Sequence, residues 1–316
     1  MEYTSDSSVN ATNRPSSFQK KTIVIAGATG HLGKRIAVHL VNSKVHVIAL
    51  VRKSSPPNQT GFLEKLGVTL VVVDFDNPSQ LAAACAGATC IISVVSGLEE
   101  VIIDTQTKLL QAALQAGVPR FIPSDYSIDY TKLSYGSNRN LDLRRQFNEQ
   151  LDKAPIAATS ILNGMFTDLL TGQAPVILFG LKRVVYWGDA DQLLDFTTME
   201  DTAVYTARAA LDEATPRYLR IAGDVVSARE LKEVASSVTG KTFRLLRAGG
   251  LNSLQTMIRV TRTLFPKREE VFPPWQGMQY LHNMFTGKPK LQPLDNDRYT
   301  GIQWTSVRDV LEKKGK

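Results

Sequence analysis

Apolar positions in the first half of the chain fall into short β-branched runs, each followed by a stretch with helical spacing. Ile23, Val24 and Ile25 form the first run, and the amphipathic sequence KRIAVHLV follows it after a glycine-rich turn. Further apolar runs stand in VHVIALV, GVTLVVV, CIISVV and VPRFI. Strands that alternate with helices in this rhythm predict an α/β fold with a parallel, doubly wound Rossmann sheet.

The spacing also predicts individual helices between these runs. One begins near Pro78, with a helix-capping role for Asp76 as an alternative to a place beside the cofactor, and one covers VIIDTQTKLLQAALQAG up to Gly117. A polar helix is expected over residues 141–151, and IAATSILNGMF reads as a sixth strand. This strand would deliver Asn163 to the edge of the sheet at which the other strands end.

The second half continues with strands and helices as far as KTFRLL and then changes character. From Gly249 onward helical stretches are split by prolines at 266, 273, 274, 289 and 293. This composition predicts a smaller, mostly helical C-terminal lobe that holds a substrate. We therefore expect a tail over residues 1–19, a nucleotide-binding domain over 20–160, and further sheet strands with the lobe over 161–316, with interleaved boundaries.

Glycines spaced GxxGxxG follow the first strand at Gly27, Gly30 and Gly33. The first permits a tight turn, the second lets backbone N–H groups approach a pyrophosphate, and the third lets helix and strand pack closely. The positive end of the helix dipole then favours the anion. The sequence predicts a dinucleotide site here, formed by Gly27, Thr29, Gly30, His31 through its backbone, Leu32 and Gly33.

The second strand ends in Arg52 and Lys53, with no acidic residue beside them. At this position an acidic side chain binds the ribose 2′-hydroxyl of NAD, whereas an arginine accommodates the 2′-phosphate of NADP. The pair therefore indicates NADP(H). The alternative is an ordinary solvent-exposed basic loop.

Several other side chains should meet at the carboxyl edge of the sheet, because ligands of such sheets bind beyond the ends of the strands. The expected cofactor contacts are Asp74, Phe75, Ser96, Gly97, Ser124 and Asn163, and the expected substrate contacts are Asp125, Met165 and Phe166.

The composition of the 316 residues is typical of a globular protein, with 43% hydrophobic and 21% charged residues. Cys85 and Cys90 match no zinc spacing and no CxxC motif, so we expect buried thiols in a reducing, cytoplasmic setting and no metal site. The uncharged stretch 80–98 approaches the length of a membrane span, but its small residues and Gly87 favour a helix end, a turn and a strand. No membrane association is expected.

The net charge of +7 arises within residues 201–316. The segment from Lys241 to Arg268 is rich in basic residues and contains no acidic one. This basic strip is typical of a solvated face, and it also fits an acidic ligand or a protein partner. No nucleic-acid-binding module accompanies the charge, so nucleic acid is not expected.

The segments GATGHLGKRI, ALVRK, VVVDFDNPSQL, RFIPSDY, ATSILNGMF and DFTTMEDTAVYTA resemble the NmrA-like family of atypical short-chain dehydrogenases, which includes the isoflavone and phenylcoumaran benzylic ether reductases. The resemblance covers the chain from about residue 20 into the C-terminal region. It implies a Rossmann domain with a substrate lobe, NADPH as cofactor, and Arg52 at the 2′-phosphate.

The resemblance also exposes a difference in the catalytic region. The Tyr-x-x-x-Lys pattern of ordinary short-chain dehydrogenases is absent, and the position of the lysine that these reductases use falls on Arg144. Burial lowers the pKa of a lysine and lets it act as a base, whereas arginine keeps its charge. Arg144 can polarise an oxygen atom or hold an acidic substrate, or it can be a plain surface residue. Ser124 and Tyr126 are further catalytic candidates, Tyr126 as a proton donor.

The first functional hypothesis is an NADPH-dependent reductase that transfers hydride to a small aromatic or quinone-like molecule. The alternative is a non-catalytic, NADP(H)-binding redox sensor that acts through protein partners, which fits both Arg144 and the basic strip. An isomerase or ether-cleaving enzyme that uses NADP is a third hypothesis.

Overall fold

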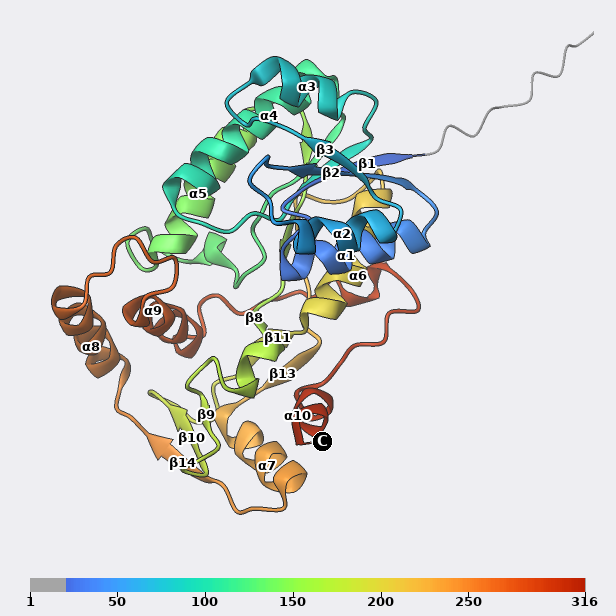
Figure 1. Ribbon diagram of the computed structural model, residues 1–316. Helices are drawn as coiled ribbons and strands as arrows, with labels where there is room; N and C mark the ends of the chain where they lie inside the picture. The colour runs from blue at the N-terminus through green and yellow to red at the C-terminus, as the bar shows by residue number, and fades with distance from the viewer. Residues whose placement is uncertain (1–20, 316) are drawn as a thin grey trace, which may run out of the picture.

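The computed structural model describes residues 21–315, and the expected N-terminal tail lies outside them. A six-stranded parallel sheet has the order β3-β2-β1-β4-β5-β6 (Figure 1). Its strands are β1 Thr22–Ala26, β2 His46–Val51, β3 Thr69–Val72, β4 Cys90–Ser93, β5 Arg120–Ile122 and β6 Ala157–Ala158. The order reverses between β1 and β4, which is where a doubly wound sheet binds its ligand. The predicted Rossmann fold is confirmed.

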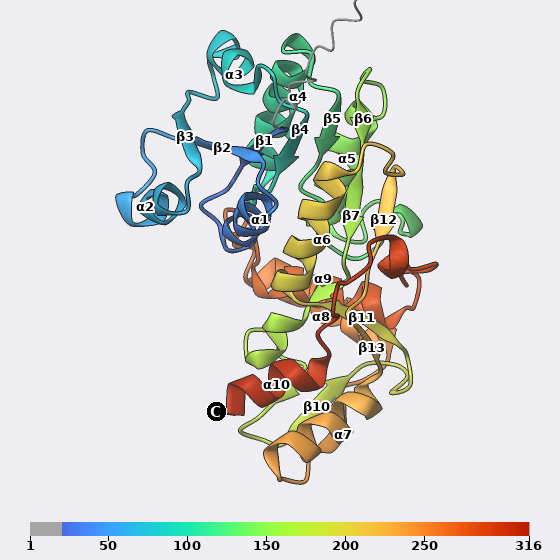
Figure 2. The same cartoon turned by 90° about the vertical axis from the view of Figure 1, so that its right-hand side faces the viewer.

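Helices cover both faces of this sheet (Figure 2). Alternate residues of β1 point to opposite faces, so Ile23 and Ile25 pack with one hydrophobic cluster and Val24 packs with another. The first cluster includes residues of α1 His31–Asn42 and α6 Met199–Leu211, and the second includes residues of α3 Pro78–Cys85, α4 Gln106–Gln115 and α5 Arg139–Leu151. α2 Pro57–Lys65 lies between β2 and β3 in the chain.

Three expected helix boundaries need correction. Asn77, not Asp76, caps α3 by accepting a hydrogen bond of 3.1 Å from the backbone of Gln80, and Asp76 instead pairs with Lys108 on α4. The helix before Gly117 begins as a π-helix, η1 Glu100–Thr105, and continues as α4. α5 begins at Arg139, two residues before the expected start, because the Asn138 side chain caps it.

The expected sixth strand is divided among three sheets. β6 stays in the main sheet, β7 Ser160–Leu162 pairs with β12 Tyr218–Arg220, and β8 Met165–Phe166 pairs with β11 Leu194–Thr197. Gly164 makes the bend between β7 and β8, with a φ of +68° and no room for a side chain, because a Cβ there would lie 2.3 Å from the Asp195 backbone oxygen. This bend leads the chain from the nucleotide-binding region into a second unit.

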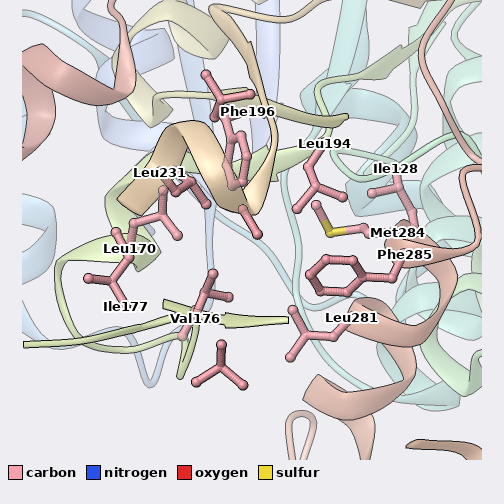
Figure 3. Close-up of a cluster of buried hydrophobic side chains, with 14 of the residues drawn as sticks. Ile128, Leu170, Val176, Ile177, Leu194, Phe196, Leu231, Leu281, Met284 and Phe285 are labelled. Carbon is pink, nitrogen blue, oxygen red and sulfur yellow. The ribbon is translucent and has the colours of Figure 1, made fainter. Parts of the chain in front are cut away.

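The second unit has its own core of buried apolar side chains (Figure 3). Leu194, Phe196, Leu281 and Phe285 belong to it, together with residues of the loops around β9 Ile177–Leu178. Two three-stranded sheets, β14-β10-β9 and β13-β11-β8, share it with helices. The remaining elements are β10 Arg183–Tyr186, β13 Asp224–Val226, α7 Ala228–Thr239, β14 Arg244–Arg247, α8 Leu251–Leu264, α9 Pro274–Phe285 and α10 Val307–Gly315.

Within residues 21–315, no helix has both the length and the apolar character needed to cross a membrane.

Candidate functional site

The turn between β1 and α1 is built on glycines that leave no room for a side chain. Gly27 has a φ of +90°, and a Cβ there would lie 2.4 Å from the backbone oxygen of Val94 at the end of β4. A Cβ at Gly33 would lie 2.3 Å from the backbone oxygen of Gly27. Both positions therefore require glycine. This close approach of β1, α1 and the end of β4 is the geometry that a phosphate-binding turn needs.

In the first turn of α1, no side chain caps the backbone N–H groups and no acidic side chain would repel an anion. Gly30 occupies the N-cap position without a side-chain hydrogen bond, and no acidic residue stands in the first turn. Gly30 and His31 are exposed and Thr29 is half-buried, whereas the Leu32 side chain packs into the core beneath α1. Leu32 can therefore meet a cofactor only through its backbone. The bare N–H groups and the helix dipole fit a pyrophosphate.

Arg52 and Phe75 come together at the ends of the neighbouring strands β2 and β3. The Arg52 guanidinium lies over the Phe75 ring, 5.7 Å from its centroid. The Arg52 backbone is held in a turn, in which its N–H donates to the Ser55 hydroxyl at 3.1 Å and its carbonyl accepts from the Ser55 N–H at 2.9 Å. The Arg52 side chain stays exposed and forms no ion pair within the described part of the chain. It is placed to meet a phosphate from solvent.

Lys53 and Asp74 flank this pair without adding an ion pair to it. Lys53 is exposed. The Asp74 carboxylate accepts from the Asp76 N–H at 2.9 Å, and the Asp74 N–H donates to the Gln80 side chain at 2.7 Å. Asp74 therefore closes the turn after β3, and it is also exposed toward the expected adenosine end of the site.

The ends of β4 and β5 are tied to each other through Ser124. Its hydroxyl donates to the Val95 carbonyl at 2.6 Å, and its backbone N–H donates to the side-chain oxygen of Gln106 on α4 at 3.0 Å. Ser96 is exposed nearby in the chain, and Gly97 is buried where a Cβ would lie 2.4 Å from the Val101 side chain. Ser124 uses its only hydroxyl proton in this link, so its contribution to the site is to position the two strand ends.

Asp125 was expected to contact substrate, but the structure places it at the centre of a buried polar network. The residue is fully buried, and its carboxylate accepts from the Tyr130 hydroxyl at 2.9 Å, the Asn148 amide at 2.9 Å and the Ser160 hydroxyl at 2.5 Å. Burial raises its pKa, which these donors and the nearby Arg144 and Arg217 oppose. Asp125 therefore joins β5, α5 and β7 and has no free face for a substrate.

Tyr126 was expected to be a proton donor, but it is a core residue. Its ring belongs to the cluster between the sheet and helices α1 and α6, and its hydroxyl is enclosed without a hydrogen-bond partner. Burial raises the pKa of Tyr126, and the neighbouring Thr206 hydroxyl, which already donates to the Thr202 carbonyl, opposes this shift. A phenol in this position has no route to a substrate, so we do not retain Tyr126 as a catalytic candidate.

Arg144 is buried, which excludes the alternative of a surface helix residue. Only 9% of it is exposed. Its Nη1 donates to the backbone oxygen of Asn140, one turn earlier on α5, at 2.9 Å, while its Nε is enclosed without a partner. The guanidinium thus brings a charge into the interior of the molecule at the position expected for the catalytic lysine.

Helix α9 of the second unit covers this part of α5, a contact that the sequence did not reveal. Gln276 donates to the Asn138 side chain at 2.6 Å, and Asn138 donates in turn to Asn283 at 3.3 Å. Tyr280 lies between these two on α9, and burial raises its pKa while Arg144 and Arg139 lower it. No local pattern links residues 276–283 to Arg144, because the contact spans more than a hundred residues of chain.

Asn163 follows β7, which pairs with β12 outside the six-stranded sheet, and its backbone is tied to Ser127 after β5. The Asn163 N–H donates a hydrogen bond to the Ser127 carbonyl at 2.9 Å, and the Asn163 carbonyl accepts one from the Thr197 hydroxyl at 2.7 Å. Its side chain is fully buried, and neither amide atom has a hydrogen-bond partner. Such groups are normally satisfied, so this amide fits a polar group of a bound ligand. Met165 and Phe166 follow it half-buried on β8.

Residues 21–315 contain no group of three or more His, Cys, Asp or Glu side chains placed to hold a metal ion. The basic strip covers β14, α8 and the turns beside them. Arg262 on α8 stacks on the Trp275 ring at 5.2 Å, and Lys267, in the turn after α8, pairs with Glu270 at 2.8 Å. Part of its charge therefore serves contacts within the second unit.

Comparison with known proteins agrees with this geometry. The model of the NmrA-like family matches residues 19–285. The chain is 30% identical over 240 residues to the isoflavone reductase homolog IRL of Zea mays, a match that covers 72% of this chain and 77% of the maize protein.

Two solved structures share the fold. One is described as AtPrR2 with NADP+ and (+)pinoresinol, with a TM-score of 0.78, 20% identity and coverage of 94% of this chain and 99% of that one. The other is an NADPH-dependent quinone oxidoreductase, QOR2, complexed with NADPH from Escherichia coli, with a TM-score of 0.70, 20% identity and coverage of 92% and 99%.

Proposed function

Because the chain belongs to the NmrA-like family, we propose that it is an NADPH-dependent reductase of a small aromatic or quinone-like substrate. The observation that carries the proposal is the glycine turn after strand β1, in which Gly27 and Gly33 have no room for a side chain. Strand β2, which ends at the exposed Arg52, is the neighbour of β1 in the sheet. NADP+, NADPH, pinoresinol and quinones are named for the two structures of the same fold. These descriptions support the same class of cofactor and substrate here.

The described residues fit the cofactor from one end to the other. The Gly27, Gly30 and Gly33 turn would hold the pyrophosphate, and Arg52 would hold the 2′-phosphate, with Lys53, Asp74 and Phe75 around the adenosine. Ser96, Gly97 and the unpartnered amide of Asn163 would line the nicotinamide end. When bound, NADPH supplies the hydride.

On the substrate side, Arg144 is the group that we assign to the chemistry. It stays positively charged, so it can stabilise negative charge on a substrate oxygen but cannot remove a proton. Met165 and Phe166 are half-buried on opposite faces of β8, since Met165 packs against the core of the second unit and Phe166 against the cluster of α1 and α6. Either one, but not both, would offer apolar surface to an aromatic ring. Ser124 holds the ends of β4 and β5 in place through its bond to Val95.

One observation favours the redox-sensor alternative, namely the arginine at the position of the catalytic lysine. A protein that only binds NADP(H) and catalyses no reaction does not need a catalytic base at this position. The same residue also fits a reductase whose substrate needs no deprotonation. Of the relatives described above, the maize protein is named as a homolog of isoflavone reductase and QOR2 as a quinone oxidoreductase. The reductase therefore remains the first proposal.

The test is oxidation of NADPH, followed by its absorbance, with a panel of quinones, isoflavones and phenylpropanoid ethers. The proposal predicts consumption of NADPH with at least one of them and much slower consumption of NADH. Tight binding of NADPH without oxidation by any member of the panel would contradict it and would favour the sensor. Pull-downs in the presence of NADP+ or NADPH would then show whether a protein partner binds the two cofactor complexes with different affinity.

A further inference from the structure

Arg144 carries a permanent positive charge on α5, a helix whose first residue bonds to Gln279 of α9 (Figure 1). It is 91% buried and forms no ion pair with any residue in the described range 21–315. A buried charge is unfavourable unless an opposite charge and hydrogen bonds compensate it. The chain itself supplies one hydrogen bond, from Nη1 to the Asn140 carbonyl at 2.9 Å.

The Nε and Nη2 atoms of the guanidinium form no hydrogen bond with another described residue, and together they make one edge of its planar group. Its Nε is enclosed and without a partner, and no hydrogen bond between described residues uses its Nη2. These two N–H groups point in parallel from one edge of a planar fork. A carboxylate accepts two parallel hydrogen bonds from such an edge, whereas a single carbonyl or ether oxygen leaves one donor unused.

The neighbouring carboxyl group of the chain does not fill this role. Asp125 lies close enough for Arg144 to lower its pKa, but burial raises that pKa more strongly. Its oxygen atoms accept from Tyr130, Asn148 and Ser160. Asp125 is therefore committed to its own network and leaves the free edge of Arg144 unmatched.

Helix α9 adds further donors and no acid on the other side. Its sequence PWQGMQYLHNMF contains no acidic residue. The Tyr280 ring lies near both Arg144 and Arg139, whose charges oppose the effect of burial on its pKa. One turn before it, Gln276 is fully buried and its side-chain oxygen has no partner. The surroundings of the free edge are thus positively charged and rich in hydrogen-bonding groups.

We propose that the substrate is an aromatic carboxylate, whose carboxylate group binds the Nε–Nη2 edge of Arg144. The proposal rests on the proposed function for the aromatic framework of the substrate and for the location of the site. It supplies the opposite charge that the buried Arg144 lacks within the described residues.

The test compares carboxylates with their neutral amides by calorimetry, on protein saturated with NADP+ so that no turnover occurs. The probes are cinnamate with cinnamamide and benzoate with benzamide. We expect at least one carboxylate to bind about tenfold or more tightly than its amide, since a charge-assisted bidentate contact is worth that much. Arg144→Met should abolish the preference.

Arg244→Met is the matched control, because it removes the same charge from an exposed position on β14. It should leave the preference unchanged. If Arg144→Met does not fold, Arg144→Lys keeps the charge without the bidentate edge and should weaken the preference.

Equal binding of carboxylates and amides, or a preference that survives both Arg144 substitutions, would overturn the inference. The outcome is separable from the proposed function. Oxidation of NADPH by neutral aromatics, without any carboxylate preference, would support the reductase and contradict only this inference. Carboxylate-selective binding without any oxidation of NADPH would support this inference and contradict the reductase.

Discussion

The Arg52 guanidinium and the Phe75 ring lie 5.7 Å apart, from centre to centroid, at the ends of the neighbouring strands β2 and β3. The contact holds a long, exposed side chain in one direction by a cation–π interaction. A charge that is oriented in advance loses less entropy when it binds a phosphate. The pair is therefore the part of the site that should distinguish NADPH from NADH.

Arg52→Ala should weaken NADPH binding by about 1.5–3 kcal/mol, because it removes a charge-assisted hydrogen bond to the 2′-phosphate. Binding of NADH, which lacks that phosphate, should change little. Fluorescence titration with each cofactor measures both effects, and Lys65→Ala, which removes an exposed charge at the end of α2, serves as the control. If both cofactors lose the same affinity, Arg52 has only a structural role.

Gly27→Ala should disrupt the cofactor site. The position has a φ of +90°, and the new Cβ would lie 2.4 Å from the backbone oxygen of Val94. The backbone must move, so we expect NADPH affinity to fall at least about tenfold and the melting temperature to drop. The matched control is Gly61→Ala in α2, where a Cβ meets nothing within 4 Å. Unchanged NADPH affinity in Gly27→Ala would show that the turn does not hold the pyrophosphate.

Asp125→Asn should destabilise the fold. Tyr130, Asn148 and Ser160 all donate to this carboxylate, and an amide has one oxygen for these three donors. Leaving a buried donor unpaired lowers the free energy of unfolding by about 1–3 kcal/mol, measurable by urea denaturation. The exposed Asp76→Asn should change it far less. If Asp125→Asn had the same free energy of unfolding as the wild type, the hydrogen-bond network around Asp125 would not exist in solution.

The pH dependence of stability follows from the same carboxyl group. Burial raises the pKa of Asp125 above that of the unfolded chain, so the folded state binds this proton more tightly. The resulting stabilisation is complete below the unfolded pKa of about 3.9 and is lost as the pH rises through the folded pKa. The difference in unfolding free energy between wild type and Asp125→Asn should therefore shrink as the pH rises from about 4 to about 7. If the difference in unfolding free energy grew over this pH range, the pKa of Asp125 would be lowered in the folded state, not raised.

Tyr126→Phe should leave turnover and NADPH affinity unchanged. The Tyr126 hydroxyl is enclosed with only the Thr206 hydroxyl beside it, and Thr206 donates its own proton to the Thr202 carbonyl, so removal of the Tyr126 hydroxyl should change the stability little. Initial rates and thermal melting of the variant check this directly. A loss of turnover of tenfold or more, with normal folding, would restore Tyr126 as a proton donor.

The sequence was informative wherever a feature depends on neighbours along the chain. Gly27 and Gly33, the strand ends at Arg52 and Ser124, and most helices could be located because turn geometry, strand period and caps are local. Side-chain direction could not be predicted in the same way. Asp125 and Tyr126 follow the same strand, but the former enters a polar network and the latter enters the core, and only the packing of α5, α6 and β7 decides this.

Contacts between distant segments were also beyond the sequence. The division of IAATSILNGMF among three sheets depends on partner strands β11 and β12, which come much later in the chain. The position of Tyr280 near Arg144 depends on how α9 packs across α5. The cofactor end of the site, which is built from local turns, was therefore easier to predict than the substrate end.

The most direct test of the reductase proposal is the fate of the hydride. The protein is incubated with NADPH that carries deuterium at nicotinamide C4 and with an aromatic substrate found in the oxidation panel, and the product is analysed by mass spectrometry. The proposal predicts that one deuterium appears on a carbon atom of the reduced product and that Arg52→Ala slows this transfer at low NADPH concentration. NADPH that stays unoxidised with every substrate, or a product that contains no deuterium from either face of the labelled nicotinamide, would contradict it.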